Sequence, residues 1–203
     1  NRFLKDSYAV AHEDVETFRY RGYGCPGKTH FTTTDGRTQE CRYTDFWGTD
    51  ETQWQLPFRC KVCPDGIGEA ADIAAADDWP GGGPDPATED EDAGTNSLVV
   101  RTARGVALVE AAQAAGFLTL ENDVDPRYMD SVQPHQMKKK YVVRARWDGL
   151  ASRGRTVPRS ARLRLDELND ELDAAMYSAQ TEGTRNRVDA GKTSETMPAR
   201  RER

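Results

Sequence analysis

The first third of the chain has the polar and apolar alternation that is typical of β-strands. Residues 14–20 alternate in this way, and an Arg-Gly-Tyr-Gly run that suits a turn follows them. Residues 30–34 and 37–43 are rich in β-forming side chains and lie on either side of Asp35-Gly36, a dipeptide typical of tight turns between paired strands. The pattern therefore predicts one strand followed by a β-hairpin.

The middle of the chain combines short apolar runs with a loop. Residues 70–76 form an apolar run that is too short for periodicity to decide between a buried strand and a short helix. Residues 79–94 are rich in proline, glycine and acidic side chains, which predicts a loop. A strand at 97–101, a helix at 102–115 that ends at a glycine, and a strand at 117–120 complete a βαβ-like unit.

The C-terminal part has a helical pattern. Residues 127–146 and 163–179 carry it, whereas residues 183–203 have too little apolar surface to offset the entropy of ordering. We expect a domain at 1–140, a helical extension at 141–182 and a disordered tail. The predicted fold class is α/β, of the α+β kind: a β-hairpin and cysteine-rich region, a strand-helix-strand unit, and C-terminal helices.

Composition excludes several classes of protein. The 28 Lys and Arg against 34 Asp and Glu give a net charge of -6, whereas a nucleic-acid-binding protein needs a basic surface. No apolar run approaches the ~20 residues that cross a bilayer, so we expect no membrane span. No secretory signal is visible, which predicts a cytoplasmic protein. Because the chain begins at Asn1 rather than at Met, we expect it to be a fragment or a processed piece.

Charge is unevenly distributed along the chain. No Lys or Arg occurs between residues 64 and 100, whereas residues 138–164 contain ten basic side chains and one acidic one, Asp148. Such a run is usually solvated surface, and the alternative is a basic face that binds phosphates or an acidic partner.

Four cysteines lie in the first third of the chain, and none follows. Cys60 and Cys63 form a C-x-x-C pair whose two thiolates can reach one metal centre. Cys25 and Cys63 each precede a proline, a step that also appears in iron–sulfur ferredoxin motifs. We interpret Cys60 and Cys63 as metal ligands, and Cys41, in the predicted hairpin, as a packed thiol without a ligand role.

Other interpretations of the cysteines remain open at this point. A four-cysteine zinc site normally has two C-x-x-C pairs, and this chain has one. A thioredoxin-like dithiol requires the pair at a helix N-terminus, but Pro64-Asp65-Gly66 follows it here. Unligated packing is the third interpretation.

Four motifs together resemble one known family. They are Tyr-Arg-Gly-Tyr-Gly-Cys-Pro-Gly at 20–27, Arg-Cys-Lys-Val-Cys-Pro-Asp at 59–65, Glu-Ala-Ala-Asp-Ile-Ala-Ala-Ala-Asp-Asp-Trp at 69–79 and Asn-Ser-Leu-Val-Val-Arg-Thr-Ala-Arg-Gly at 96–105. In this order they resemble the C-terminal part of the beta subunit of coenzyme F-420-reducing hydrogenase and formate dehydrogenase. That family includes 7-hydroxymethyl chlorophyll a reductase and divinyl protochlorophyllide 8-vinyl reductase. Its members are longer, so we expect an N-terminal portion that precedes this chain, and we expect the chain to be inactive without it.

The resemblance implies an FAD and a [4Fe-4S] cluster. Electrons would pass between a ferredoxin-type donor or a partner hydrogenase or dehydrogenase subunit, the two cofactors, and an organic substrate such as coenzyme F-420 or a chlorophyll precursor. The family's ligand positions fall on Cys25, Cys60 and Cys63. Cys41 matches no family motif, so the resemblance leaves the fourth ligand open between Cys41 and a residue of the N-terminal portion.

The flavin site is expected where a strand meets a helix. Arg101, Thr102 and Gly105 stand at such a junction, where free N–H groups and the helix dipole favour a diphosphate, although Thr102 could equally be only a helix cap. Further candidates for the flavin site are Asp72, Asp77, Asn96, Ser97 and Lys138. His135 is the candidate for proton delivery, because the pKa of a histidine suits that role.

A second class of function stays open from the sequence. The alternative to the oxidoreductase is a non-catalytic cysteine–zinc module that binds a protein partner through the acidic loop. Iron with acid-labile sulfide and a flavin would favour the first, and zinc without flavin the second.

Overall fold

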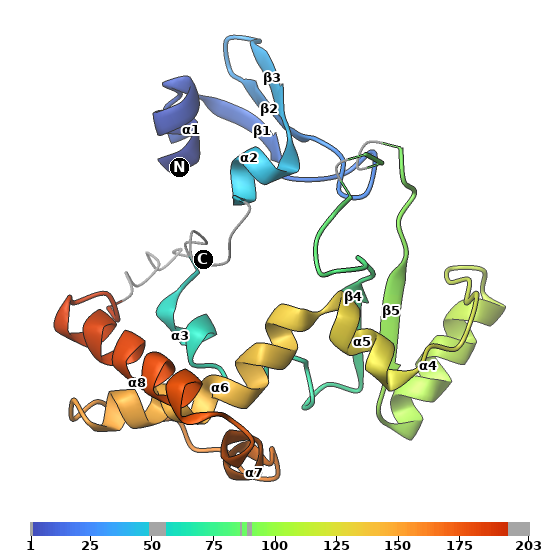
Figure 1. The fold of residues 1–203 in the computed structure, drawn as a ribbon. Coiled ribbons are helices and arrows are strands. Elements are labelled where there is room, and N and C mark those ends of the chain that lie inside the picture. The colour runs from blue at the N-terminus through green and yellow to red at the C-terminus, as the bar shows by residue number, and fades with distance from the viewer. Residues whose placement is uncertain (1, 49–55, 86, 89–90, 195–203) are drawn as a thin grey trace, which may run out of the picture. The chain divides into compact units, whose positions relative to one another are not determined.

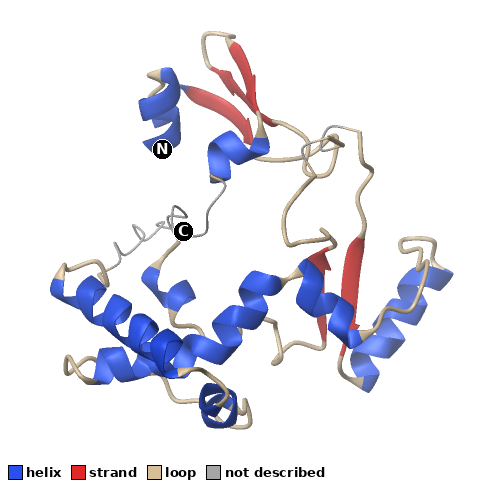
Figure 2. Cartoon of the chain, viewed as in Figure 1, coloured by secondary structure: helices blue, strands red, loops and turns tan. Residues whose placement is uncertain are grey.

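The computed structural model describes residues 2–48, 56–85, 87–88 and 91–194 of the 203. The chain divides into two compact units (Figure 1). The first comprises Asn1–Gln55 and Asp77–Ser97, and the second comprises Leu56–Ala76 and Leu98–Arg203. Helices and two small antiparallel sheets are mixed along the chain, so the α+β fold class is confirmed (Figure 2).

The first unit is built on a three-stranded antiparallel sheet in the order β1-β2-β3. Its elements are α1 (Arg2–Tyr8), a 3-10 turn (His12–Asp14), β1 (Val15–Arg19), β2 (Thr29–Thr33), β3 (Thr38–Cys41) and α2 (Tyr43–Trp47). Phe31 on the central strand is buried together with Leu4 and Val10. The predicted first strand and the predicted hairpin are therefore confirmed.

The hairpin turn has the local chemistry that its sequence predicts. Gly36 has a φ of +84°, and its N–H donates to the carbonyl oxygen of Thr33 at 2.8 Å. The Thr33 hydroxyl donates to Oδ1 of Asp35 at 2.5 Å, and this hydrogen bond is the main reason why the pKa of Asp35 lies below its usual value. The turn thus fixes the register in which Thr29 lies opposite Cys41.

The second unit is mostly helical. Its elements are α3 (Phe58–Lys61), β4 (Ile73–Asp77), β5 (Asn96–Val100), α4 (Ala103–Ala114), α5 (Pro126–Val132), α6 (Pro134–Ala151), α7 (Leu165–Asp170) and α8 (Ala174–Asp189). The boundary between the units runs through the β4–β5 sheet, because Asp77, Asn96 and Ser97 belong to the first unit. Among the residues that the structure describes, no helix is both long and apolar enough to cross a membrane.

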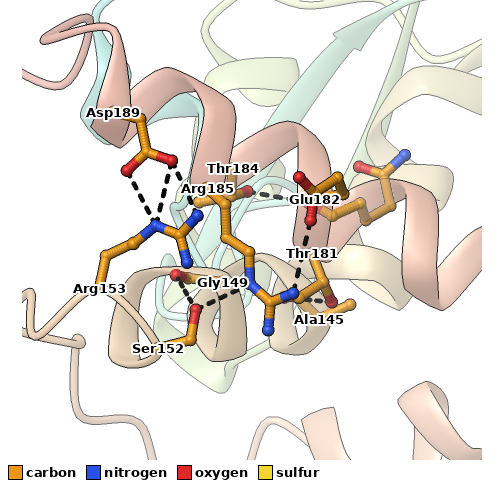
Figure 3. Close-up of polar contacts among 10 residues, drawn as sticks. Ala145, Gly149, Ser152, Arg153, Thr181, Glu182, Thr184, Arg185 and Asp189 are labelled. Atoms are coloured by element: carbon orange, nitrogen blue, oxygen red, sulfur yellow. Dashed lines mark hydrogen bonds and ion pairs between the residues drawn. The ribbon is translucent and has the colours of Figure 1, made fainter.

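The core of the second unit forms where α6 packs against α7 and α8. Its buried side chains are Val62, Val143, Trp147, Leu150, Leu165 and Val188. Figure 3 shows polar contacts that α8 makes with α6 and with the turn after it. Thr181 donates to the carbonyl oxygen of Ala145 in α6 at 3.1 Å, and Arg153 in the turn pairs with Asp189 at 2.8 Å. The C-terminal half of α6 is therefore joined to α8 by apolar and polar contacts.

Gly149 allows α6 and α8 to approach closely. A Cβ at this position would lie 2.7 Å from the carbonyl oxygen of Thr181 and 2.8 Å from Cβ of Thr184. We expect Gly149→Ala to destabilise the chain by about 1–2 kcal/mol, because overpacking outweighs the gain in helix propensity. Thermal unfolding followed by circular dichroism measures this.

Gly183 provides the matched control in α8. A Cβ there would meet only the end of the flexible Arg187 side chain, at 3.5 Å. Gly183→Ala should therefore stabilise the chain by up to about 1 kcal/mol. Equal effects of the two substitutions would contradict the close approach at Gly149.

Four parts of the helical region differ from the prediction. The expected helix at 163–179 is divided between α7, which ends at Asp170, and α8, which begins at Ala174. Residues 117–120 form no strand, and Phe117 is 87% exposed, so the βαβ-like unit is wrong. The expected helix at 127–146 is divided between α5 and α6, because Gln133 leaves the helical conformation before Pro134. In addition, α8 continues past residue 183 to Asp189, since Thr184 and Val188 are buried against α6 and supply the apolar contact that the polar sequence did not indicate.

Candidate functional site

The C-x-x-C pair lies on a short helix and its exit. Cys60 is in the last turn of α3, and Cys63 follows Val62, the residue that ends this helix. Both thiols are free and half-buried. The two thiols therefore lie three residues apart, at the end of one short helix.

α6 contacts the backbone on both sides of Cys63. Nη1 of Arg146 donates to the carbonyl oxygen of Lys61 at 2.8 Å, and Nε1 of Trp147 donates to the carbonyl oxygen of Val62 at 2.9 Å. Nζ of Lys140 lies 3.5 Å from the carbonyl oxygen of Pro64. The backbone that carries Cys63 is therefore held by side chains from a single helix.

The loop after Cys63 is held from several sides. Lys140 forms an ion pair with Glu69, and Nη2 of Arg101 donates to the carbonyl oxygen of Ile67 at 3.0 Å. Partial burial disfavours the ionised form of Asp65, but hydrogen bonds from the N–H groups of Ala70 and Glu69 outweigh it and lower the pKa of this carboxyl. The loop is thus a connected polar network.

Cys25 lies in a tight glycine-rich loop of the first unit. Nε1 of Trp79 donates to Sγ of Cys25 at 3.2 Å, and a Cβ at Gly94 would come within 2.6 Å of the same sulfur. The Trp79 ring in turn packs edge-on against Tyr43, whose burial raises its pKa to about 12. The sulfur of Cys25 is therefore placed by an N–H donor and by the backbone of a neighbouring loop.

Cys41 has different surroundings. It ends β3 and interacts with the hydroxyl of Tyr8, and this hydrogen bond is the largest cause that raises the pKa of Tyr8 to about 12. Burial raises the pKa of the Cys41 thiol above its usual value. The environment of Cys41 therefore favours the protonated thiol over the thiolate that binds metals.

The cysteines are shared between the two units. Cys25 and Cys41 belong to the first, and Cys60 and Cys63 to the second. Within the described residues, no group of three or more His, Cys, Asp and Glu side chains lies close enough to hold a metal. The convergence of Cys25, Cys60 and Cys63 on one centre stays a prediction.

Four of the candidate flavin residues meet at the start of α4. Thr102 caps the helix by accepting from the N–H of Gly105 at 3.1 Å, and its hydroxyl donates to Oδ1 of Asp72 at 2.6 Å. A Cβ at Gly105 would lie 2.6 Å from the carbonyl oxygen of Asp72, so only glycine allows β4 and α4 this close. The N–H of Arg101 donates to the same carbonyl oxygen at 2.9 Å. The predicted cap at Thr102 is confirmed.

The other candidates lie elsewhere. Asp77 binds Nη1 of Arg21 at 2.8 Å, and the buried hydroxyl of Ser97 lies 3.4 Å from Oδ2 of Asp78, while Asn96 is exposed. These residues belong to the first unit. His135 and Lys138 lie in the first turns of α6 in the second unit, half-buried and exposed respectively.

Comparison with known families decides what kind of chain this is. A family model for the C terminus of the beta subunit of coenzyme F-420 hydrogenase/dehydrogenase matches residues 1–126, more than half of the chain. The chain belongs to this family. The resemblance carried by the four motifs is thereby confirmed at the level of the family. No curated protein and no solved structure matches the chain significantly.

Membership makes the chain part of an oxidoreductase family whose name describes a hydrogenase or dehydrogenase subunit. The match contains all four cysteines and the β4–α4 junction, and it ends at the start of α5. Helices α6, α7 and α8 lie beyond it. The donors that hold the backbone around Cys63 therefore come from outside the matched region of this beta-subunit family.

Sequence reasoning missed the contacts of Lys140 and Trp147 in α6, and of Trp79 with Cys25. One signal was available for α6. Lys140, Val143, Trp147 and Leu150 recur at spacings of three and four, which places them on one helix face, and all four are buried. That pattern would have predicted a buried lysine in the basic run.

Proposed function

We propose that this chain is the cofactor-binding part of an iron–sulfur flavoprotein oxidoreductase. It passes electrons between a [4Fe-4S] cluster, FAD and an organic substrate. The observation that carries the proposal is the free, half-buried Cys60–Cys63 pair on one turn of a chain that belongs to this redox family. A cytoplasmic location is part of the proposal.

Three thiols have the chemistry of cluster ligands. Cys60 and Cys63 present two sulfurs from one segment, and Cys25 accepts an N–H hydrogen bond from Trp79, the kind of contact that tunes cluster potentials. Cys41 is the weaker candidate, because its raised pKa disfavours the thiolate. The proposed ligands are therefore Cys25, Cys60 and Cys63, and the fourth comes from outside this set.

The flavin is proposed to bind near the β4–α4 junction. Nη1 of Arg101 is buried and has no hydrogen-bond partner among the described residues, so it remains as a donor for a phosphate oxygen. FAD supplies one-electron and two-electron chemistry when bound. Asp72, Thr102 and Gly105 shape the junction, and Asp77, Asn96, Ser97 and Lys138 are proposed as further contacts. His135 is proposed to deliver a proton to the organic substrate.

The electron partners are proposed by class. A ferredoxin or a partner hydrogenase or dehydrogenase subunit exchanges electrons with the cluster, and coenzyme F-420 or a chlorophyll precursor is the organic substrate. Reduction of a deazaflavin and of a divinyl pigment by reduced ferredoxin, assayed side by side, distinguishes the two substrates.

Cofactor analysis tests the proposal directly. The chain is purified without oxygen, reconstituted with iron, sulfide and FAD, desalted, and analysed for iron, acid-labile sulfide, zinc and flavin. Iron with equal sulfide and bound flavin is the expected result. Zinc without flavin would replace the proposal with the non-catalytic zinc module.

Arg101→Ala should weaken FAD binding by about tenfold or more, because a charge-assisted hydrogen bond contributes about 1.5–3 kcal/mol. Fluorescence titration of the reconstituted chain with FAD measures the dissociation constant. Arg155→Ala, which removes an exposed arginine after α6, is the control. If Arg101→Ala folds and binds FAD as tightly as the control, the diphosphate lies elsewhere.

A further inference from the structure

We propose that α6 is the platform that positions the Cys60–Cys63 pair, with Lys140, Arg146 and Trp147 as its positioning residues. The inference rests on the proposed function, in which this pair binds the cluster. It adds a role for a helix that lies beyond the family match.

The first argument is the pattern of hydrogen bonds. Carbonyl groups at the end of a short helix lack intrahelical partners and must find others. Those of Lys61 and Val62 accept from Arg146 and Trp147, at 2.8 Å and 2.9 Å, and that of Pro64 faces Lys140. Donors from one rigid helix therefore fix the backbone immediately before and after Cys63.

The second argument is the buried charge. The side chain of Lys140 is only 7% exposed, and burying an ammonium group is costly unless it is paired. Its partners lie at both ends of the loop that leaves the cysteine pair, the carbonyl oxygen of Pro64 at one end and the carboxylate of Glu69 at the other. An apolar residue would fill the same volume but could not hold these two groups together.

The third argument is apolar. The side chain of Val62, which lies between the two cysteines, is buried in the same cluster as Val143 and Trp147 of α6. The side chain of Val62 is thus anchored to α6 by apolar packing. Its backbone carbonyl group is anchored to the same helix by the hydrogen bond from Nε1 of Trp147. Cys63 directly follows this anchored residue, and Cys60 precedes it by two positions.

Selective exposure of the thiols distinguishes positioning from general stability. The metal-free chain is treated with iodoacetamide without oxygen, well below its melting temperature, and the alkylation rate of each cysteine is followed by peptide mapping. The variants are Lys140→Met, which removes the ammonium, and Trp147→Phe, which removes the N–H donor but keeps a ring in the core. Lys192→Met, an exposed lysine after α8, is the control.

We expect both test variants to accelerate alkylation of Cys60 and Cys63 several-fold and to leave Cys25 and Cys41 unchanged. A second measurement, competition titration with Zn²⁺, should show an affinity lowered about tenfold or more, as for other residues that orient metal ligands. The control should match the original chain in both measurements.

Two outcomes would overturn the inference. Equal acceleration at all four cysteines would mean that α6 only stabilises the chain. Unchanged rates at Cys60 and Cys63 in folded Trp147→Phe would mean that the contacts do not position the pair, even if Lys140→Met fails to fold. The alkylation rates need no metal, so a chain that binds no cluster but shows the selective pattern would refute the proposed function and leave the positioning role intact.

Discussion

Cys60→Ser and Cys63→Ser are expected to abolish cluster binding. A serine hydroxyl is a poor substitute for the thiolate that holds iron, and the C-x-x-C pair supplies two of the proposed ligands from one segment. After anaerobic reconstitution and desalting, iron and sulfide per chain should fall to about a tenth or less of the original content, together with the visible absorbance of the cluster.

Cys41→Ser is the matched control for these variants. Cys41 is also free and half-buried, but burial raises the pKa of its thiol and it interacts with Tyr8. We expect it to keep the iron content of the original chain. Loss of iron in Cys41→Ser equal to that in Cys60→Ser would make Cys41 the fourth ligand, and it would overturn the interpretation of Cys41 as a packed thiol without a ligand role.

Local chemistry made part of the fold predictable. The Asp35-Gly36 turn and the Thr102 cap each depend on residues adjacent in sequence, so their signals are complete within a few positions. The strand expected at 117–120 failed because a short apolar run becomes a strand only where another strand pairs with it. Phe117 lies exposed instead, and among the described residues β4 is the only strand beside β5.

The sequence named the candidate residues of the site but not the contacts that they make. The C-x-x-C spacing made Cys60 and Cys63 candidate ligands, which stays a prediction. The junction residues Arg101 and Thr102 meet the loop after the cysteines and Asp72, respectively. The contact between Lys140 and Glu69 joins residues 71 positions apart, and nothing in either local sequence indicates the other. Buried polar pairs of this kind depend on the packing of whole helices.

In the loop that carries Cys25, too, the local sequence predicted the turn but not the packing contacts. Its glycines predicted a turn, and for Gly27 the packed backbone gives a further reason why the residue must be glycine. Gly27 has a φ of +68°, and a Cβ there would lie 2.4 Å from the carbonyl oxygen of Gly22. The N–H of Gly22 in turn donates to the carbonyl oxygen of Pro26 at 2.7 Å, so the two sides of the loop are joined across Cys25.

Gly27→Ala is therefore expected to open this loop. A left-handed conformation costs a non-glycine residue roughly 1–2 kcal/mol, and the overlap with backbone that cannot rotate away adds about 1–3 kcal/mol. Gly36→Ala is the matched control, because Gly36 also has a positive φ, +84°, but has nothing within 4 Å of its Cβ position. It should show only the conformational cost.

Measuring both stability and thiol exposure distinguishes the conformational cost of a positive φ from the cost of overlap with the backbone. Thermal unfolding should rank the original chain above Gly36→Ala and Gly36→Ala above Gly27→Ala. Alkylation of Cys25 should accelerate only in Gly27→Ala, because opening the loop frees its sulfur from Trp79 and Gly94. Equal stability of the two variants, with Cys25 unchanged in both, would show that the close approach of Gly27 to Gly22 does not hold Cys25 in place.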